Sequence, residues 1–161
     1  MNTKVFVLGL DGATWDLIKP WSEMGELPTF KMMIQNGVYG NLVSCIPPVT
    51  YPAWKCYSTG KNPGKLGVFS FVKFNPQTFK VKICNSIDFK AKEIWDYLGE
   101  KNIRVAIIDM PTTYPPKKVN GVMVSETPFP TSNFTYPKDF KEELYRHALK
   151  YLGVEDGEDK A

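Results

Sequence analysis

Residues 46–71, IPPVTYPAWKCYSTGKNPGKLGVFSF, organise the rest of the chain around Thr50. An apolar segment, Val38–Cys45, predicts a strand that leads into this stretch, and the residues after Thr50 predict a helix. Tyr51 precedes a proline, which favours an extended backbone, and Pro52 suits the first position of a helix because its missing N–H needs no partner there. Thr50 is therefore predicted to lie between a strand and the start of a helix.

A hydroxyl at such a junction allows two interpretations. The functional one is an oxygen nucleophile beside a seat for an anion, because the first N–H groups of a helix and the helix dipole attract phosphate. The structural one is a helix cap, a role in which threonine is common. The local sequence alone favours the cap, so the functional interpretation depends on residues elsewhere in the chain.

Length and composition indicate one globular domain. The chain has 161 residues, of which 43% are apolar and 23% charged, so it is too apolar for disorder and short for two sizeable cores. We expect a single α/β domain over residues 1–153 and a polar, frayed tail over residues 154–161. The net charge of +3 forms no basic stripe, and no nucleic-acid partner is expected.

Further features of the sequence bear on its compartment. No apolar run approaches the ~20 residues of a membrane span, so no membrane partner is expected. The N-terminus lacks the pattern of a signal peptide, which indicates a cytoplasmic protein. Cys45, Cys56 and Cys84 are odd in number and lack metal-type spacing, and we interpret them as reduced, mostly buried thiols.

Apolar runs separated by helical patterns predict an α/β fold. Lys4–Leu10 and Ile103–Asp109 have the composition of strands buried on both faces, as in a parallel sheet, and Gly121–Ser125 is a shorter strand. Residues 67–74 and 78–84 predict two strands or ordered loops around a turn. Helices are predicted at residues 15–21, 28–36, 91–98 and 137–152, with Pro20 ending the first. The order indicates a mostly parallel sheet flanked by helices.

Polar residues follow three of the predicted strands. Asp11, Thr50 and Asp109 each come just after one, and ligands of such sheets bind beyond the carboxyl ends of the strands. Asp11 precedes Gly12 and is either a carboxylate ligand for a divalent metal or the cap of the next helix. Asp109 allows the same two interpretations, and the cap or turn is favoured there because Pro111 follows so soon.

Two segments, taken in order, carry a resemblance to a known family. They are VFVLGLDGATWDLIKPW and LPTFKMMIQNGVYGNLVSCIPPVTYPAWKCYSTGKNPGKLGVFSF, and the likeness spans residues 4–140. The chain resembles the N-terminal part of the alkaline phosphatase superfamily, in the type I phosphodiesterase/nucleotide pyrophosphatase branch and its subfamily of predicted phosphohydrolases or phosphomutases. The specific parts are the Asp-Gly after the first strand and the Thr-Tyr-Pro ahead of Thr59-Gly60.

The resemblance implies an alkaline phosphatase-like α/β sandwich that hydrolyses phosphate esters at a two-metal site, usually zinc. Asp11 matches the first metal ligand of the family. Thr50 matches the nucleophile, which also contacts that metal and forms a covalent phosphoryl- or nucleotidyl-threonine. The implied substrate is a small phosphate ester or a nucleotide.

Three departures from the family pattern limit what this chain can supply. The remaining ligands of the family are aspartates and histidines far downstream, which this sequence does not include. Ala53 stands where pyrophosphatase relatives carry a phosphate-holding asparagine, and Leu66 replaces a common histidine. We therefore expect an incomplete fold and a partial metal site, so that the 161 residues alone bind zinc weakly and show little or no hydrolase activity.

Two other functions remain open at this point. One is a metal-dependent phosphosugar mutase of the same superfamily, against which Thr50 counts because those enzymes usually use serine. The other is a non-catalytic binding or regulatory remnant, favoured by the missing ligands and opposed by the intact Asp11 and Thr50. An incomplete sheet leaves an unpaired edge or an apolar face, so self-association is expected.

Overall fold

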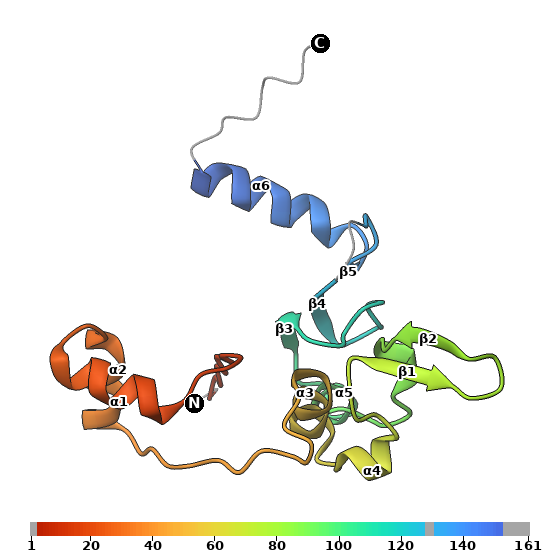
Figure 1. The fold of residues 1–161 in the computed structure, drawn as a ribbon. Helices are drawn as coiled ribbons and strands as arrows, with labels where there is room; N and C mark the ends of the chain where they lie inside the picture. Colours follow the sequence, from red (N-terminus) through yellow and green to blue (C-terminus); the bar gives the residue numbers. More distant parts are fainter. Residues whose placement is uncertain (1–2, 128–130, 153–161) are drawn as a thin grey trace. The chain divides into compact units, whose positions relative to one another are not determined.

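The computed structural model describes residues 3–127 and 131–152, and it divides into two compact units, Met1–Val43 and Ser44–Ala161 (Figure 1). The single domain expected over residues 1–153 stays a prediction, and the expected tail at 154–161 lies outside the described residues. None of the helices in the described ranges is long and apolar enough to cross a membrane.

The N-terminal unit contains two helices that contact each other, α1 (Trp15–Met24) and α2 (Pro28–Asn36). The side chain of Thr14 caps α1 by accepting a hydrogen bond from the backbone N–H of Asp16. The helix ends at Gly25, whose φ of 89° few other residues adopt. Pro20 lies inside α1, so the prediction that it ends the helix is wrong; a proline removes one hydrogen bond, and the residues that follow keep theirs.

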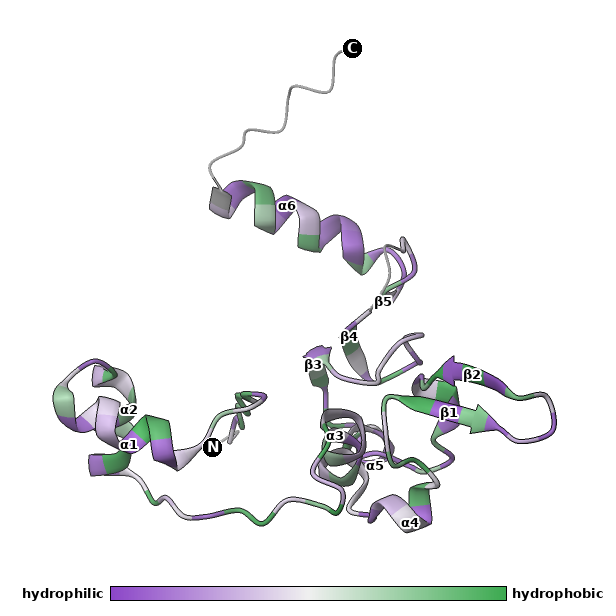
Figure 2. Ribbon diagram, viewed as in Figure 1, coloured by the Kyte–Doolittle hydropathy of each residue, from purple (hydrophilic) through white to green (hydrophobic). Residues whose placement is uncertain are grey.

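Two predicted strands do not form in the described structure. Lys4–Leu10 and Val38–Cys45 carry no strand, and Figure 2 shows apolar residues along the coil that follows α2. Val5 and Leu42 are 84% and 92% exposed. A strand needs a partner for its N–H and C=O groups, and the described part of the N-terminal unit contains no strand.

The C-terminal unit begins with α3 (Thr50–Thr59) and the short helix α4 (Pro63–Leu66), whose side-chain cap is Asn62. An antiparallel hairpin follows, β1 (Val72–Asn75) and β2 (Lys80–Ile83), which confirms the pair of strands expected around this turn. Asn75 holds the turn, since its side-chain oxygen accepts from the N–H groups of Gln77 and Thr78.

The second sheet lies in the later part of the same unit. After the 3₁₀ turn η1 (Ser86–Asp88) and α5 (Ile94–Glu100) come β3 (Val105–Met110) and β4 (Gly121–Ser125), which are parallel. The short strand β5 (Thr135–Tyr136) pairs antiparallel with β4, and α6 (Phe140–Leu152) follows. The sheet order is β3-β4-β5.

The architecture is of the α/β class, but the expected mostly parallel sheet is not confirmed. Within the described residues one sheet is an antiparallel hairpin and the other contains one parallel and one antiparallel pairing. The reason is local: the two N-terminal segments that would extend a parallel sheet are coil. The segment Val38–Cys45 is bonded to α1 instead, since Trp15 Nε1 donates a hydrogen bond to the carbonyl of Gly40 at 2.9 Å.

Two apolar clusters form the core of the C-terminal unit. The first joins α3, α4 and the hairpin through Tyr51, Leu66, Val68, Cys84 and Phe89. The second joins α5 to the sheet through Trp95, Ile107, Val119 and Met123. Both clusters are assembled from residues far apart in the sequence. The first packs against α3, and the second packs against β3 and β4.

Candidate functional site

Thr50 is the first residue of α3, and its side chain is half-buried. Val49 before it is extended, with φ −111° and ψ 145°, and accepts the first helical hydrogen bond from Ala53 N–H at 2.9 Å. The predicted start of a helix at this point is confirmed. Tyr51 is helical and not extended, and Pro52 occupies the third helical position, which costs no hydrogen bond because the first N–H groups of a helix have no intrahelical partner.

The electrostatics at the start of α3 favour an anion. The helix dipole places partial positive charge at its N-terminus, and the first turn contains no acidic residue. Tyr51 and Pro52 are buried, so the first turn is anchored in the protein. A phosphate group near the Thr50 hydroxyl would therefore meet a fixed, positively polarised helix end.

Asp11 lies at a turn of the N-terminal unit, where Gly12 has a φ of 70°. Its side chain is exposed, so its carboxylate is accessible to a cation. Asp11 and Thr50 belong to different units, and their convergence on one metal ion stays a prediction.

A carboxylate and a hydroxyl are suitable donors for a divalent cation, yet they make two ligands where zinc usually takes four. In the ranges 3–127 and 131–152, no three His, Cys, Asp or Glu side chains lie close enough together to hold a metal ion. His147 is exposed on α6, with Nε2 3.9 Å from Glu143, as expected for a residue on a helix face.

Asp109 lies at an irregularity of β3, because the register with β4 shifts between Ile108 and Met110. Its φ is 54° and its side chain is exposed. The chain continues through Thr112, which is buried and has a φ of 67°, a genuine outlier for a β-branched residue. Backbone strain of this kind clusters at functional sites, which directs attention to the carboxyl end of β3.

A cavity of about 90 Å³ opens at this place in the C-terminal unit. Thr112 and Tyr114 line it from the segment after β3, and Glu126 lines it from the residue after β4. The other lining residues are Tyr51, Ile83, Cys84 and Asn85. The cavity thus lies beyond the carboxyl ends of the two parallel strands, next to the first turn of α3.

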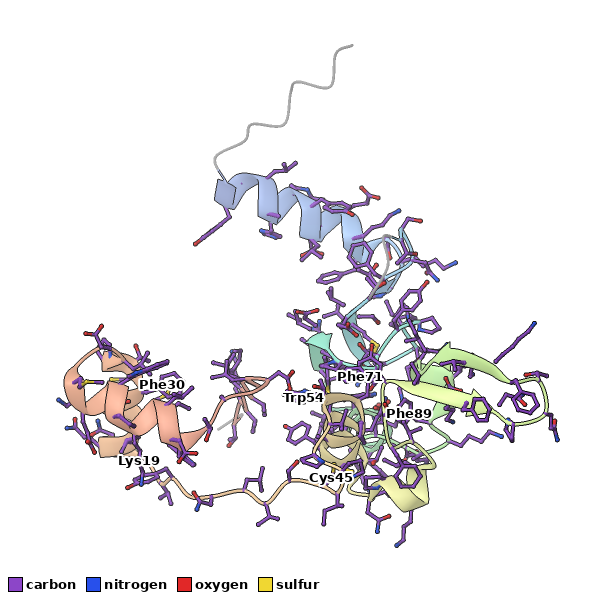
Figure 3. All side chains as sticks on the ribbon, viewed as in Figure 1. Lys19, Phe30, Cys45, Trp54, Phe71 and Phe89 are labelled. Carbon is purple, nitrogen blue, oxygen red and sulfur yellow. The ribbon has the colours of Figure 1, made fainter. Side chains whose placement is uncertain are left out.

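Burial is the main cause of the pKa shifts of the cavity residues Glu126 and Tyr51. Burial raises the pKa of Glu126, and the nearby Asp109 carboxylate raises it further, while the Thr112 backbone N–H opposes the shift by donating to Glu126. Burial also raises the pKa of the Tyr51 phenol, with a smaller contribution from the Glu126 charge. Phe71, labelled in Figure 3, packs against Tyr51 with ring centroids 4.6 Å apart.

The three cysteines are free thiols, as expected, although only Cys84 is fully buried. Burial, followed by the neighbouring Cys45 thiol, raises the pKa of Cys56 to about 11. At neutral pH Cys56 is therefore an unreactive thiol in the middle of α3.

Sequence reasoning located Thr50 but missed the cavity beside it. Asn85, Thr112, Tyr114 and Glu126 come from separate segments, and none belongs to a recognisable motif. One signal was present, since Glu126 directly follows the predicted strand Gly121–Ser125, as Asp109 ends another.

A family model described as type I phosphodiesterase / nucleotide pyrophosphatase matches residues 5–160. Searches of curated proteins and of solved structures gave no match to this chain. The matched residues include both Asp11 and Thr50.

Proposed function

The chain belongs to the type I phosphodiesterase / nucleotide pyrophosphatase family, and we propose on this basis that it takes part in phosphate-ester hydrolysis with Thr50 as the nucleophile. The family's activity is of the phosphodiesterase or pyrophosphatase type, and its members are typically metal-dependent. The observation that carries the proposal is the position of Thr50, a half-buried hydroxyl at the start of a helix whose first turn contains no acidic residue.

The reaction proceeds in two displacements on phosphorus. Thr50 gives its hydroxyl proton to water, and its Oγ1 forms a bond to phosphorus while the ester P–O bond breaks and the alcohol leaves with a proton. A water molecule then attacks the phosphothreonine, which restores the hydroxyl and releases phosphate or a phosphomonoester. The dipole of α3 stabilises the charge on the non-bridging oxygens in both steps.

Asp11 and Thr50 are the residues that would hold a divalent metal, with zinc as the expected ion. A bound divalent cation lowers the pKa of a coordinated hydroxyl and offsets charge on the phosphate oxygens. Because these residues provide at most two ligands, we expect the 161-residue chain to bind zinc weakly in isothermal titration. Tight stoichiometric binding that survives Asp11→Asn would contradict the role of Asp11.

Substitution of Thr50 tests the nucleophile in a protein preparation that turns over phosphate esters. Thr50→Ala should reduce kcat/KM for a chromogenic phosphodiester by at least about 10³-fold, since the loss of a nucleophile removes the covalent route. The matched control is Thr59→Ala at the other end of α3, where the lost hydroxyl donates to the carbonyl of Lys55 at 2.6 Å. It should leave turnover within about 3-fold, because Thr59 lies at the far end of the helix, about 13 Å along its axis from Thr50.

Circular dichroism and thermal melting verify that both variants fold. Unchanged turnover in folded Thr50→Ala would reject the nucleophile and favour the non-catalytic binding module instead. A mutase would return the phosphoryl group to a second hydroxyl of the sugar, whereas a hydrolase releases a free alcohol together with phosphate or a phosphomonoester, so analysis of the products distinguishes the two.

A further inference from the structure

The cavity between α3, the hairpin and the ends of β3 and β4 is lined mainly by uncharged polar groups and one carboxyl group. Its polar lining groups are the Glu126 carboxyl, the Asn85 amide, the Thr112 hydroxyl and the phenols of Tyr51 and Tyr114. Ile83 and Cys84 add an apolar wall. No lysine, arginine or histidine of the described residues lines it, so it lacks the cationic side chains that bind phosphate groups strongly.

The charge around the cavity also excludes an anion. Glu126 already shares its surroundings with the Asp109 carboxylate, and burial disfavours its own charged form. An incoming phosphate would add negative charge close to the Glu126 carboxyl group and the Asp109 carboxylate. The same groups suit a neutral ligand, because hydroxyl, amide and carboxyl groups can both accept hydrogen bonds and, when protonated, donate them.

The size of the cavity limits what can enter. At about 90 Å³ it is smaller than the ~150 Å³ cavity that accepts a benzene ring. Glycerol is about the size of benzene, and a purine or pyrimidine base is larger than both, so a chain of two or three hydroxylated carbons suits this cavity better than a base does. The apolar wall of Ile83 and Cys84 would contact such a carbon chain while the polar groups bind its hydroxyls.

The position of the cavity relates it to Thr50. Tyr51 lines it, and consecutive Cα atoms are ~3.8 Å apart, so the nucleophile and the cavity wall share the first turn of α3. A phosphate group at the start of the helix would place its ester alcohol within reach of the cavity. Thr112, which is buried and has a strained φ of 67°, forms one wall of the cavity.

We propose that this cavity binds the alcohol portion of the substrate, and that the substrate is a phosphate ester of a small neutral polyol such as glycerol. The inference rests on the proposed function for its link to catalysis, but binding of the alcohol alone does not require turnover. Glu126 and Tyr114 act as specificity-determining residues that hydrogen-bond the polyol.

Ligand-observed NMR on the 161-residue chain tests the cavity with glycerol as the probe. Saturable binding is expected, weakened about 3- to 10-fold by Glu126→Gln or Tyr114→Phe, as loss of one hydrogen bond predicts. Glu126→Gln changes a carboxyl group and Tyr114→Phe removes a phenol hydroxyl. If one variant fails to fold, the other still tests the proposal. Glu142→Gln, an exposed glutamate on α6, is the matched control and should bind glycerol like the wild type.

Three competitors define the outcomes that overturn the proposal. Adenosine, ethanolamine or inorganic phosphate binding more tightly than glycerol, with the same sensitivity to Glu126→Gln, would identify a base, cation or anion site instead. Absence of saturable glycerol binding would also overturn it. In turnover assays, Tyr114→Phe should raise KM for a glycerol phosphodiester and leave KM for a nitrophenyl diester unchanged.

The two proposals can fail separately. Loss of turnover in Thr50→Ala with glycerol binding insensitive to the cavity variants would reject the polyol site and keep the nucleophile. Specific glycerol binding with full turnover in Thr50→Ala would do the reverse.

Discussion

The Nζ atom of Lys55 lies 2.6 Å from Oε1 of Glu93, and the two side chains are 1% and 6% exposed. This buried ion pair joins α3 to the start of α5. Ser58 Oγ donates to the same carboxylate oxygen at 2.9 Å, and Lys117 Nζ lies 2.9 Å from its other oxygen. The helix that begins with Thr50 is thereby fixed to the rest of the C-terminal unit by charge as well as by apolar contacts.

Breaking this ion pair from one side should destabilise the protein strongly. Lys55→Met leaves Glu93 buried with only the partly exposed Lys117 to offset its charge, and we expect a loss of about 3 kcal/mol in the free energy of unfolding. The double variant Lys55→Met/Glu93→Gln should lose less than the sum of the single variants. Urea denaturation measures all three.

The control for this cycle is Lys92→Met. Lys92 pairs with Glu100 at the surface, and such pairs contribute little, so the denaturation midpoint should not move. Strictly additive losses at Lys55 and Glu93 would show that the two side chains are not coupled.

Gly121 is the position at which an added methyl group should do the most damage. Its φ is 140°, and a Cβ atom there would lie 2.0 Å from the backbone oxygen of Val105 on the paired strand. Gly121→Ala should lower the free energy of unfolding by more than about 3 kcal/mol, because alanine is strained at this φ and its Cβ atom would clash with β3.

Gly64→Ala in α4 is the matched control for Gly121→Ala. The nearest atom to its Cβ would be Asn62 Oδ1 at 3.6 Å, an ordinary contact, and alanine is the better helix former. Its thermal midpoint should stay the same or rise. A Gly121→Ala protein as stable as the wild type would contradict the described pairing of β3 with β4.

Glu126 should make stability depend on pH in a defined direction. Its pKa is raised by burial, so the folded state binds the proton more tightly than the unfolded state does. The stabilisation is fully present below the unfolded pKa, about 4.3 for glutamate, and is lost as the pH rises through the higher folded value. Glu126→Gln should remove this part of the pH dependence, as measured by urea midpoints across the acidic range.

Glu142→Gln provides the comparison for the pH series, since Glu142 is exposed on α6 and should leave the wild-type curve unchanged. If Glu126→Gln and the wild type give parallel curves, the Glu126 carboxyl is not held in its neutral form by the cavity.

Self-association remains a prediction for this chain. Large apolar side chains are exposed in both units, including Phe6 at 88%, Val43 at 92% and Ile108 at 66%. Their exposure is the kind of surface that favours association.

The sequence was sufficient for elements whose hydrogen bonds are local. The helix after Thr50, the helix that Gly37 terminates and the hairpin at Asn75 were each predictable, because capping and turn residues act on neighbours a few positions away. The strands at Val105–Met110 and Gly121–Ser125 were also predictable from their apolar runs. The resemblance to the family also pointed to Asp11 and Thr50, and their roles in a site stay proposals.

Only the tertiary structure decided the features that need distant segments. Lys4–Leu10 has the composition of a strand, but a strand forms only where a partner completes its hydrogen bonds, and the described structure gives it none. Lys55 and Glu93 are 38 positions apart, and the cavity draws on segments from Tyr51 to Glu126. No local sequence pattern encodes such contacts, because the groups that make them come together and become buried only when the chain folds.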